Sequence, residues 1–209
     1  MSITVIFFLG LIVALIGVIP PGLLNMTAAR ISLKEGAARG IMFSTGVSII
    51  VFIQTYIAAI FARYLSNRPD IVEILQRVAF VLFVLITIYF LILASKQKET
   101  KAKNDIKSKH GRLLHGMLLS ALNIFPIPYQ AYMTITLASF GWMDFERTNI
   151  VTYVTGASMG TFVMLYFYIF FFDKIKDKKF TSQKSMNYSI GIITGIVALI
   201  TLINILREL

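Results

Sequence analysis

The chain has 209 residues, of which 57% are hydrophobic and only 14% are charged, and its formal net charge is +10. A soluble domain is about 45–50% apolar, so this composition excludes an ordinary soluble protein and favours one that is dissolved in lipid. With no cysteine and two histidines, the chain has no disulfide, thiolate metal site or His-rich metal site, and we expect no metal and no cofactor. The basic residues are gathered between apolar stretches, which is typical of cytoplasmic loops and argues against nucleic-acid binding.

Six apolar segments are long enough to cross a bilayer, which takes roughly 20 mostly apolar residues. In chain order they cover residues 3–24, 41–62, 71–94, 113–140, 150–172 and 188–206. The first has neither the basic start nor the cleavage site of a signal peptide, so we expect it to be retained as a helix. The fourth contains Pro126 and Pro128, which are expected to break it.

The basic residues predict how the chain is oriented. If all six segments span the membrane, 15 of the 20 basic residues fall on the side that holds the loops after the first, third and fifth spans. The positive-inside rule makes these loops cytoplasmic and places both termini outside. The sequence therefore predicts a multi-pass protein of the cytoplasmic (inner) membrane.

An internal repeat relates the two parts of the chain. Thr45-Gly46-Val47-Ser48 in the second span recurs as Thr155-Gly156-Ala157-Ser158 in the fifth, at a spacing of 110 residues. The first and fourth spans correspond at a spacing of about 106, because Pro20-Pro21-Gly22 in the first matches Pro126-Ile127-Pro128 in the fourth. The chain therefore reads as one transmembrane domain with halves 1–94 and 113–209 and a basic loop 95–112. Since each half has three helices, the second half must enter from the opposite face, which predicts an all-α, inverted 3+3 repeat of the kind found in secondary transporters.

The candidate substrate site lies where the first and fourth helices break. Freed backbone groups must face protein or a polar cavity, and a helix that restarts after Gly22 would direct amide groups at a carboxylate. The simpler alternative is that the prolines only kink packed helices. The candidate substrate-binding residues are Pro21, Gly22, Asn25, Asn123, Pro126 and Gln130, with Thr45 and Thr155 as secondary candidates.

Two other functions stay open at this point. Gly156-Ala157-Ser158-Met159-Gly160 matches a hydrolase motif, so Ser158 could centre an intramembrane serine hydrolase. That enzyme would need a histidine in a neighbouring span, and glycines four residues apart are more simply explained by close helix packing. A non-transporting membrane scaffold is the third reading. No carboxylate lies in the middle of a span, and His115 lies at the start of the fourth, so no coupling ion can be assigned.

The first span, its Pro21-Gly22 pair, Asn25 and the short basic piece with Arg30 and Lys34 resemble the LysE/RhtB family of amino-acid exporters. The resemblance extends over nearly the whole chain, although Leu23 stands where the family usually has a second proline. It implies a six-helix membrane fold and export of an amino acid or similar small zwitterion, driven by an ion gradient. Partners would be this solute and the lipid bilayer, and a homo-oligomer is left open. Related branches export metal ions such as cadmium, which the lack of cysteines and mid-span carboxylates disfavours.

Overall fold

The computed structural model describes residues 1–19, 22–66, 68, 77, 80–81, 83–93, 108–175, 188, 191–192, 195–196, 198–199, 201–203 and 205–206. Every regular element in this part of the chain is a helix, which confirms the all-α prediction. The elements are α1 (Ile3–Val18), α2 (Leu23–Glu35), α3 (Ala37–Ser66), the π-helical turn η1 (Tyr89–Leu93), α5 (Lys109–Leu122), α6 (Pro126–Ser139) and α7 (Arg147–Ile175).

The chain divides into two compact units. The first combines Met1–Tyr64 with Asn104–Asp173, and the second combines Leu65–Lys103 with Lys174–Leu209. The first unit therefore contains the two leading spans of each predicted half. The expected third and sixth spans belong to the second unit, and their described residues are helical apart from the π-helical turn. Much of both spans and nearly all of the basic loop 95–112 lie outside the described residues, so the exact six-helix repeat and the boundaries of the halves stay predictions.

Two helices of the first unit are long and apolar enough to cross a membrane. They are α3 and residues 147–171 of α7, with mean hydropathies of 1.9 and 1.5. The first predicted span proves to be a bent pair, because α1 ends at Val18 and α2 starts at Leu23 with an angle of 81° between them. Ile57 and Ile60 of α3 are exposed apolar side chains, as expected of a helix in contact with lipid.

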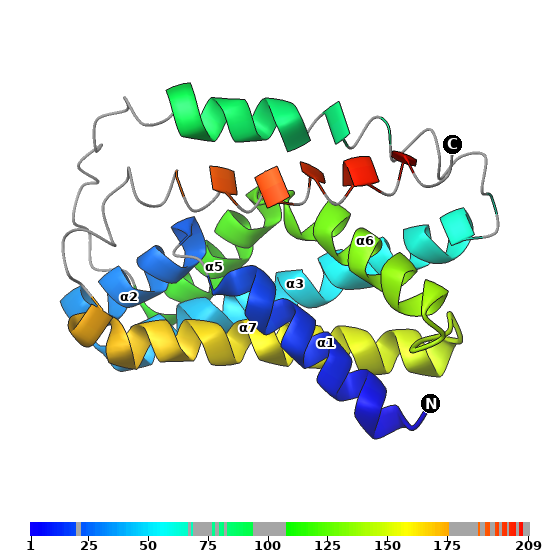
Figure 1. Cartoon of the computed structure of the whole chain (residues 1–209). Coiled ribbons are helices and arrows are strands. Elements are labelled where there is room, and N and C mark those ends of the chain that lie inside the picture. The colour runs from blue at the N-terminus through cyan, green and yellow to red at the C-terminus, as the bar shows by residue number, and fades with distance from the viewer. Residues whose placement is uncertain are drawn as a thin grey trace. The chain divides into compact units, whose positions relative to one another are not determined.

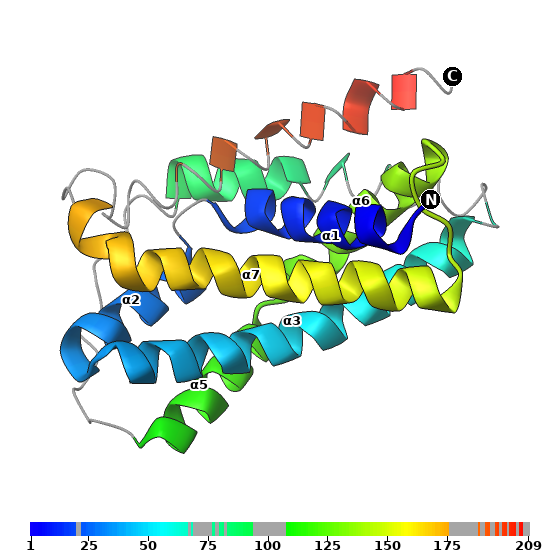
Figure 2. The same cartoon turned by 90° about the horizontal axis from the view of Figure 1, so that it is seen from below.

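The same order of elements occurs twice in the first unit. A broken helix is followed by a long one, first as α1, α2 and α3 and then as α5, α6 and α7. Figures 1 and 2 show that α3 runs opposite to α7 and that α1 runs opposite to α5. The two copies within this unit are therefore inverted relative to each other.

Glycines bring each broken helix onto the long helix of the other copy. A Cβ atom on Gly10 of α1 would lie 2.1 Å from the carbonyl oxygen of Tyr153 in α7, and one on Gly156 of α7 would lie 2.1 Å from that of Phe7. Equivalent contacts join α5 to α3, where Gly116 meets Phe43 and Gly46 meets Leu113, both at 2.1 Å. Backbones this close leave no room for a side chain. The packing role predicted for Gly156 is thereby confirmed, and Gly10 has the same role.

Apolar side chains fill both ends of the first unit. One cluster joins the start of α1, the end of α6 and the start of α7, and includes Ile6, Leu137 and Ile150. The other joins α2, the first half of α3 and the later part of α7, and includes Ile31, Phe43 and Leu165. The two helix breaks lie between these clusters along the chain.

Candidate functional site

The first helix break is lined by backbone carbonyls that side chains satisfy. The side-chain amide of Asn25 donates to the Val18 carbonyl at 2.7 Å, and the hydroxyl of Tyr168 in α7 donates to the Ile19 carbonyl at 2.8 Å. Asn25 is buried and its side chain also bonds to the Tyr168 hydroxyl. The expectation that freed carbonyls must find partners inside the protein is met here, because one partner comes from α2 itself and the other from the opposite copy.

The helix that restarts after this break has an uncapped N-terminus. Gly22 is the N-cap of α2, with extended backbone angles of φ −117° and ψ 179°, and no side chain caps the first turn. An uncapped first turn offers amide donors and the positive end of the helix dipole to an anion. Pro21 lies outside the described residues.

The second break is capped by a single residue of α3. The side-chain nitrogen of Gln54 donates to the carbonyls of Ser120 and Asn123, at 3.1 Å and 2.9 Å. Its side-chain oxygen is buried and has no hydrogen-bond partner. Gln54 therefore satisfies the carbonyls of the break and leaves one strong acceptor unused.

The prolines of the second break start a helix, although we had expected them to interrupt one. α5 ends at Leu122, and α6 begins with Pro126 at its first position. Proline fits there because its missing N–H would have had no helical partner in any case. Asn123 is the C-cap of α5 and is half-buried, and the break itself falls on residues 123–125.

Side chains of α6 connect the two breaks. The hydroxyl of Tyr129 donates to the Val13 carbonyl in α1 at 2.8 Å, and a Cβ atom on Gly17 would lie 2.7 Å from the Tyr129 ring. The next residue, Gln130, is buried and accepts a 2.8 Å hydrogen bond from the Tyr153 hydroxyl of α7. Gly17 precedes the first break and Tyr129 follows the second, so the two interruptions lie close together.

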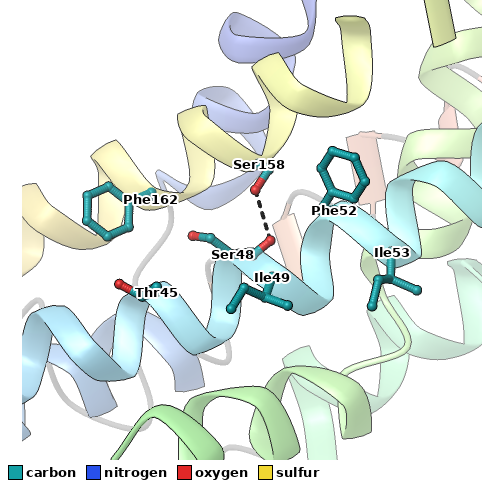
Figure 3. A pocket seen from close by; sticks show the side chains of 7 residues that line it. All are labelled: Thr45, Ser48, Ile49, Phe52, Ile53, Ser158 and Phe162. Carbon is teal, nitrogen blue, oxygen red and sulfur yellow. Dashed lines mark hydrogen bonds between the residues drawn. The ribbon is translucent and has the colours of Figure 1, made fainter. Parts of the chain in front are cut away.

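A cavity of about 310 Å³ lies between α3 and α7 (Figure 3). Its lining residues are Thr45, Ser48, Ile49, Phe52, Ile53, Ser158 and Phe162. Ser48 and Ser158, which occupy equivalent positions in the repeat, meet here, since the Ser158 hydroxyl donates to the Ser48 carbonyl at 2.9 Å. The Ser48 hydroxyl is buried without a partner. The cavity thus combines aromatic and aliphatic walls with three hydroxyls and no charge.

The two secondary candidates differ in position. Thr45 lines the cavity, whereas Thr155 does not, and each hydroxyl donates to a carbonyl one turn earlier in its own helix. Ser158 has no histidine beside it among the lining residues, and its flanking Gly156 and Gly160 contact the α1 backbone. The two glycines of this motif therefore serve close packing of α7 on α1. No group of three or more His, Cys, Asp or Glu side chains suited to a metal ion occurs among the residues that the structure describes.

Sequence reasoning missed the contribution of the tyrosines. Tyr153 and Tyr168 look like ordinary apolar-span aromatics, but their hydroxyls bond Gln130 and the first break. A buried phenol needs a hydrogen-bond partner, and this requirement was the available signal. Gln54 was visible as a costly polar residue in a span, but its partners lie 66 and 69 residues away in the chain.

Paired broken helices among apolar spans define a polytopic membrane transporter. The family model of the LysE type translocator matches residues 15–204, and the chain belongs to this family. No curated protein and no solved structure matches the chain. The protein is thus a membrane-embedded transporter of small solutes, and its family points away from an enzyme.

Proposed function

We propose that the protein exports an amino acid or similar small zwitterion across the cytoplasmic membrane and binds it between the two helix breaks. The observation that supports this most directly is the pairing of the breaks. Each is capped by a side chain of the opposite copy, Tyr168 for the first and Gln54 for the second. Movement of one copy against the other would therefore change both breaks together, as alternating access requires.

The chemistry of the breaks suits the two charged ends of a zwitterion. The uncapped start of α2 offers donors to a carboxylate. The unpartnered oxygen of Gln54 offers an acceptor to an ammonium group. Because neither the cavity nor the capping side chains carry a charge, we expect neutral amino acids to be preferred over lysine or glutamate. In the cavity between α3 and α7, the walls formed by Phe52 and Phe162 would suit an aliphatic side chain on its way to or from this site.

The proposed orientation of the chain in the membrane follows from the charge distribution. Basic residues dominate the loops that we assign to the cytoplasm, and both termini are then outside. Arg30, Lys34 and Arg39, around the junction of α2 and α3, belong to the cytoplasmic end in this arrangement.

Flux into or out of proteoliposomes tests the proposal. The purified chain is reconstituted, and uptake is measured with labelled leucine, threonine, lysine and glutamate. We expect saturable flux of the neutral amino acids that is strongly reduced by Gly22→Leu, because a leucine side chain would obstruct the first break. The control is Ile57→Leu on the exposed face of α3. Folded protein that moves none of the four solutes would contradict the proposal and favour a scaffold.

A further inference from the structure

A buried ion pair joins the two copies at one end of the first unit. Glu35, the last residue of α2, meets Arg112 in the first turn of α5. The Arg112 Nε donates to one carboxylate oxygen at 2.8 Å, and Nη2 donates to the other. The two side chains are only 9% and 8% exposed. Of the carboxylates whose side chains the structure describes, only that of Glu35 is almost fully covered, since Asp144 and Glu146 are exposed.

Other titratable and charged groups surround this pair from three helices. On α5, Arg112 Nη1 lies 3.2 Å from His115 Nδ1, which must accept because a guanidinium can only donate. On α3, Arg39 donates to the main-chain carbonyl of Glu35 at 2.8 Å, and Phe43 lies edge-on to the imidazole. On α2, Lys34 precedes Glu35. The cluster therefore holds one carboxylate and one imidazole among basic side chains.

The other end of the first unit is built differently. The last residue of α6 is Ser139, which bonds only within its own helix turn. The repeat equivalent of Arg112, at a spacing of 106 residues, is Ile6 in the apolar cluster. Inverted packing therefore does not itself require an ion pair. Burying one gives little stability over an apolar contact, whereas buried carboxylates and histidines in membrane transporters mark proton pathways.

We propose that Glu35, Arg112 and His115 form a proton-binding site that couples transport to a proton gradient. The inference rests on the proposed transport function. A proton adds to a Glu35 carboxylate oxygen, so that one O–H bond forms and a hydrogen bond from Arg112 is lost. The charge of the cluster rises by one, and the link between α2 and α5 weakens. A proton on His115 Nδ1 instead removes the Arg112–His115 bond within α5 and places a second positive charge beside Arg112. Loss of the proton restores the link, so opening at this end follows proton binding.

Two transport measurements with leucine as the probe separate coupling from movement. The first is leucine counterflow without a pH gradient, and the second is leucine accumulation driven by an imposed pH gradient. Glu35→Gln keeps the shape of a protonated carboxyl but cannot titrate. We expect it to retain counterflow and to lose accumulation by about tenfold, because a proton site has been removed. His115→Asn is expected to weaken accumulation less. Glu146→Gln, an exposed carboxylate outside the site, is the matched control and should keep both activities.

The outcomes distinguish this inference from the proposed function. A Glu35→Gln variant that accumulates leucine as the unaltered protein does would overturn the coupling site. Loss of both activities in Glu35→Gln, with a normal His115→Asn, would also overturn it, since the pair would then serve only packing. Absence of leucine counterflow in the unaltered protein would count against the proposed function instead.

A cysteine-labelling experiment tests the proton site even if the unaltered protein shows no leucine counterflow. The chain has no cysteine, so Thr45→Cys in the cavity gives a single labelling site for a membrane-impermeant maleimide. We expect its labelling, corrected for the pH dependence of the thiol with a free-thiol standard, to increase on acidification when Glu35 is present. In the Glu35→Gln background the corrected labelling should not depend on pH. A pH response that is unchanged by Glu35→Gln would refute the proton site.

Discussion

The two helix breaks share an architecture but differ in chemistry. At the first, two side chains satisfy two carbonyls, and α2 restarts from Gly22 with no side-chain cap. At the second, a single side chain, that of Gln54, bonds both carbonyls, and α6 restarts from Pro126. Because Pro126 and Pro128 lack N–H groups, the second restart has fewer donors than the first. The repeat thus gives both breaks the same shape. The first break offers the amide donors at the start of α2, and the second offers the unpartnered side-chain oxygen of Gln54 as an acceptor.

The largest expected effect comes from the contacts that the two copies share. Gly10→Ala and Gly116→Ala each place a methyl group 2.1 Å from a backbone oxygen, so a helix must move. Overpacking of this kind destabilises by about 1–3 kcal/mol or more. The two variants should lower the thermal unfolding midpoint in detergent by similar amounts. Gly195→Ala, whose nearest neighbour would be a side-chain atom at 3.4 Å, is the control. A large difference between Gly10 and Gly116 would argue against equivalent packing.

Removing the cap of the second break should have the next largest effect. Gln54→Leu deletes two hydrogen bonds at once and leaves the carbonyls of Ser120 and Asn123 without this donor. At about 0.6–1.7 kcal/mol for each interhelical bond, we expect a loss of about 1–3 kcal/mol in reversible unfolding, together with reduced flux. Thr161→Val, which removes a hydrogen bond within α7, provides the comparison. If the two variants were equally stable, the capping role of Gln54 would be wrong.

The cap of the first break should be less critical. Tyr168→Phe removes one hydrogen bond to a carbonyl of the break, that of Ile19, and also the contact between the Tyr168 hydroxyl and Asn25, while Asn25 still satisfies Val18. We expect about 0.6–1.7 kcal/mol of destabilisation by the same measurement. A loss that exceeds that of Gln54→Leu would reverse the proposed ranking of the breaks.

The smallest effect concerns the connection between α6 and α7. The Glu146 amide and the Asn149 side chain both donate to Asp144 and lower the pKa of its carboxyl. A lowered pKa in the folded state stabilises the protein above the unfolded pKa, and this contribution is lost as the pH falls through the folded value. Asp144→Asn should therefore be slightly less stable at neutral pH and converge with the unaltered protein in acid. If the difference in stability between Asp144→Asn and the unaltered protein were the same at every pH, this assignment would be wrong.

Local chemistry made the breaks predictable from sequence. Proline and glycine act on their own backbone, so the interruptions near Gly22 and Pro126 could be located to within a few residues. The repeat was readable because Thr-Gly-x-Ser recurs, and Ser48 and Ser158 do meet. The capping pattern was not predictable, because Gln54 and Tyr168 find partners that are distant in the chain. Glu35 was also missed, since it lies at a helix end before Gly36 and its burial depends on Arg112, 77 residues later.

The reciprocal glycine contacts have a consequence for how such a chain arose. The surface of α1 fits α7 and that of α5 fits α3, so the glycines at these two contacts, Gly10, Gly46, Gly116 and Gly156, are covered by the opposite copy. A protein half this length would expose both surfaces unless a second molecule, inserted upside down, supplied the missing long helix. Gene fusion of such a dual-topology dimer would yield the interlocked chain directly, and the sequences of the two breaks could then diverge independently.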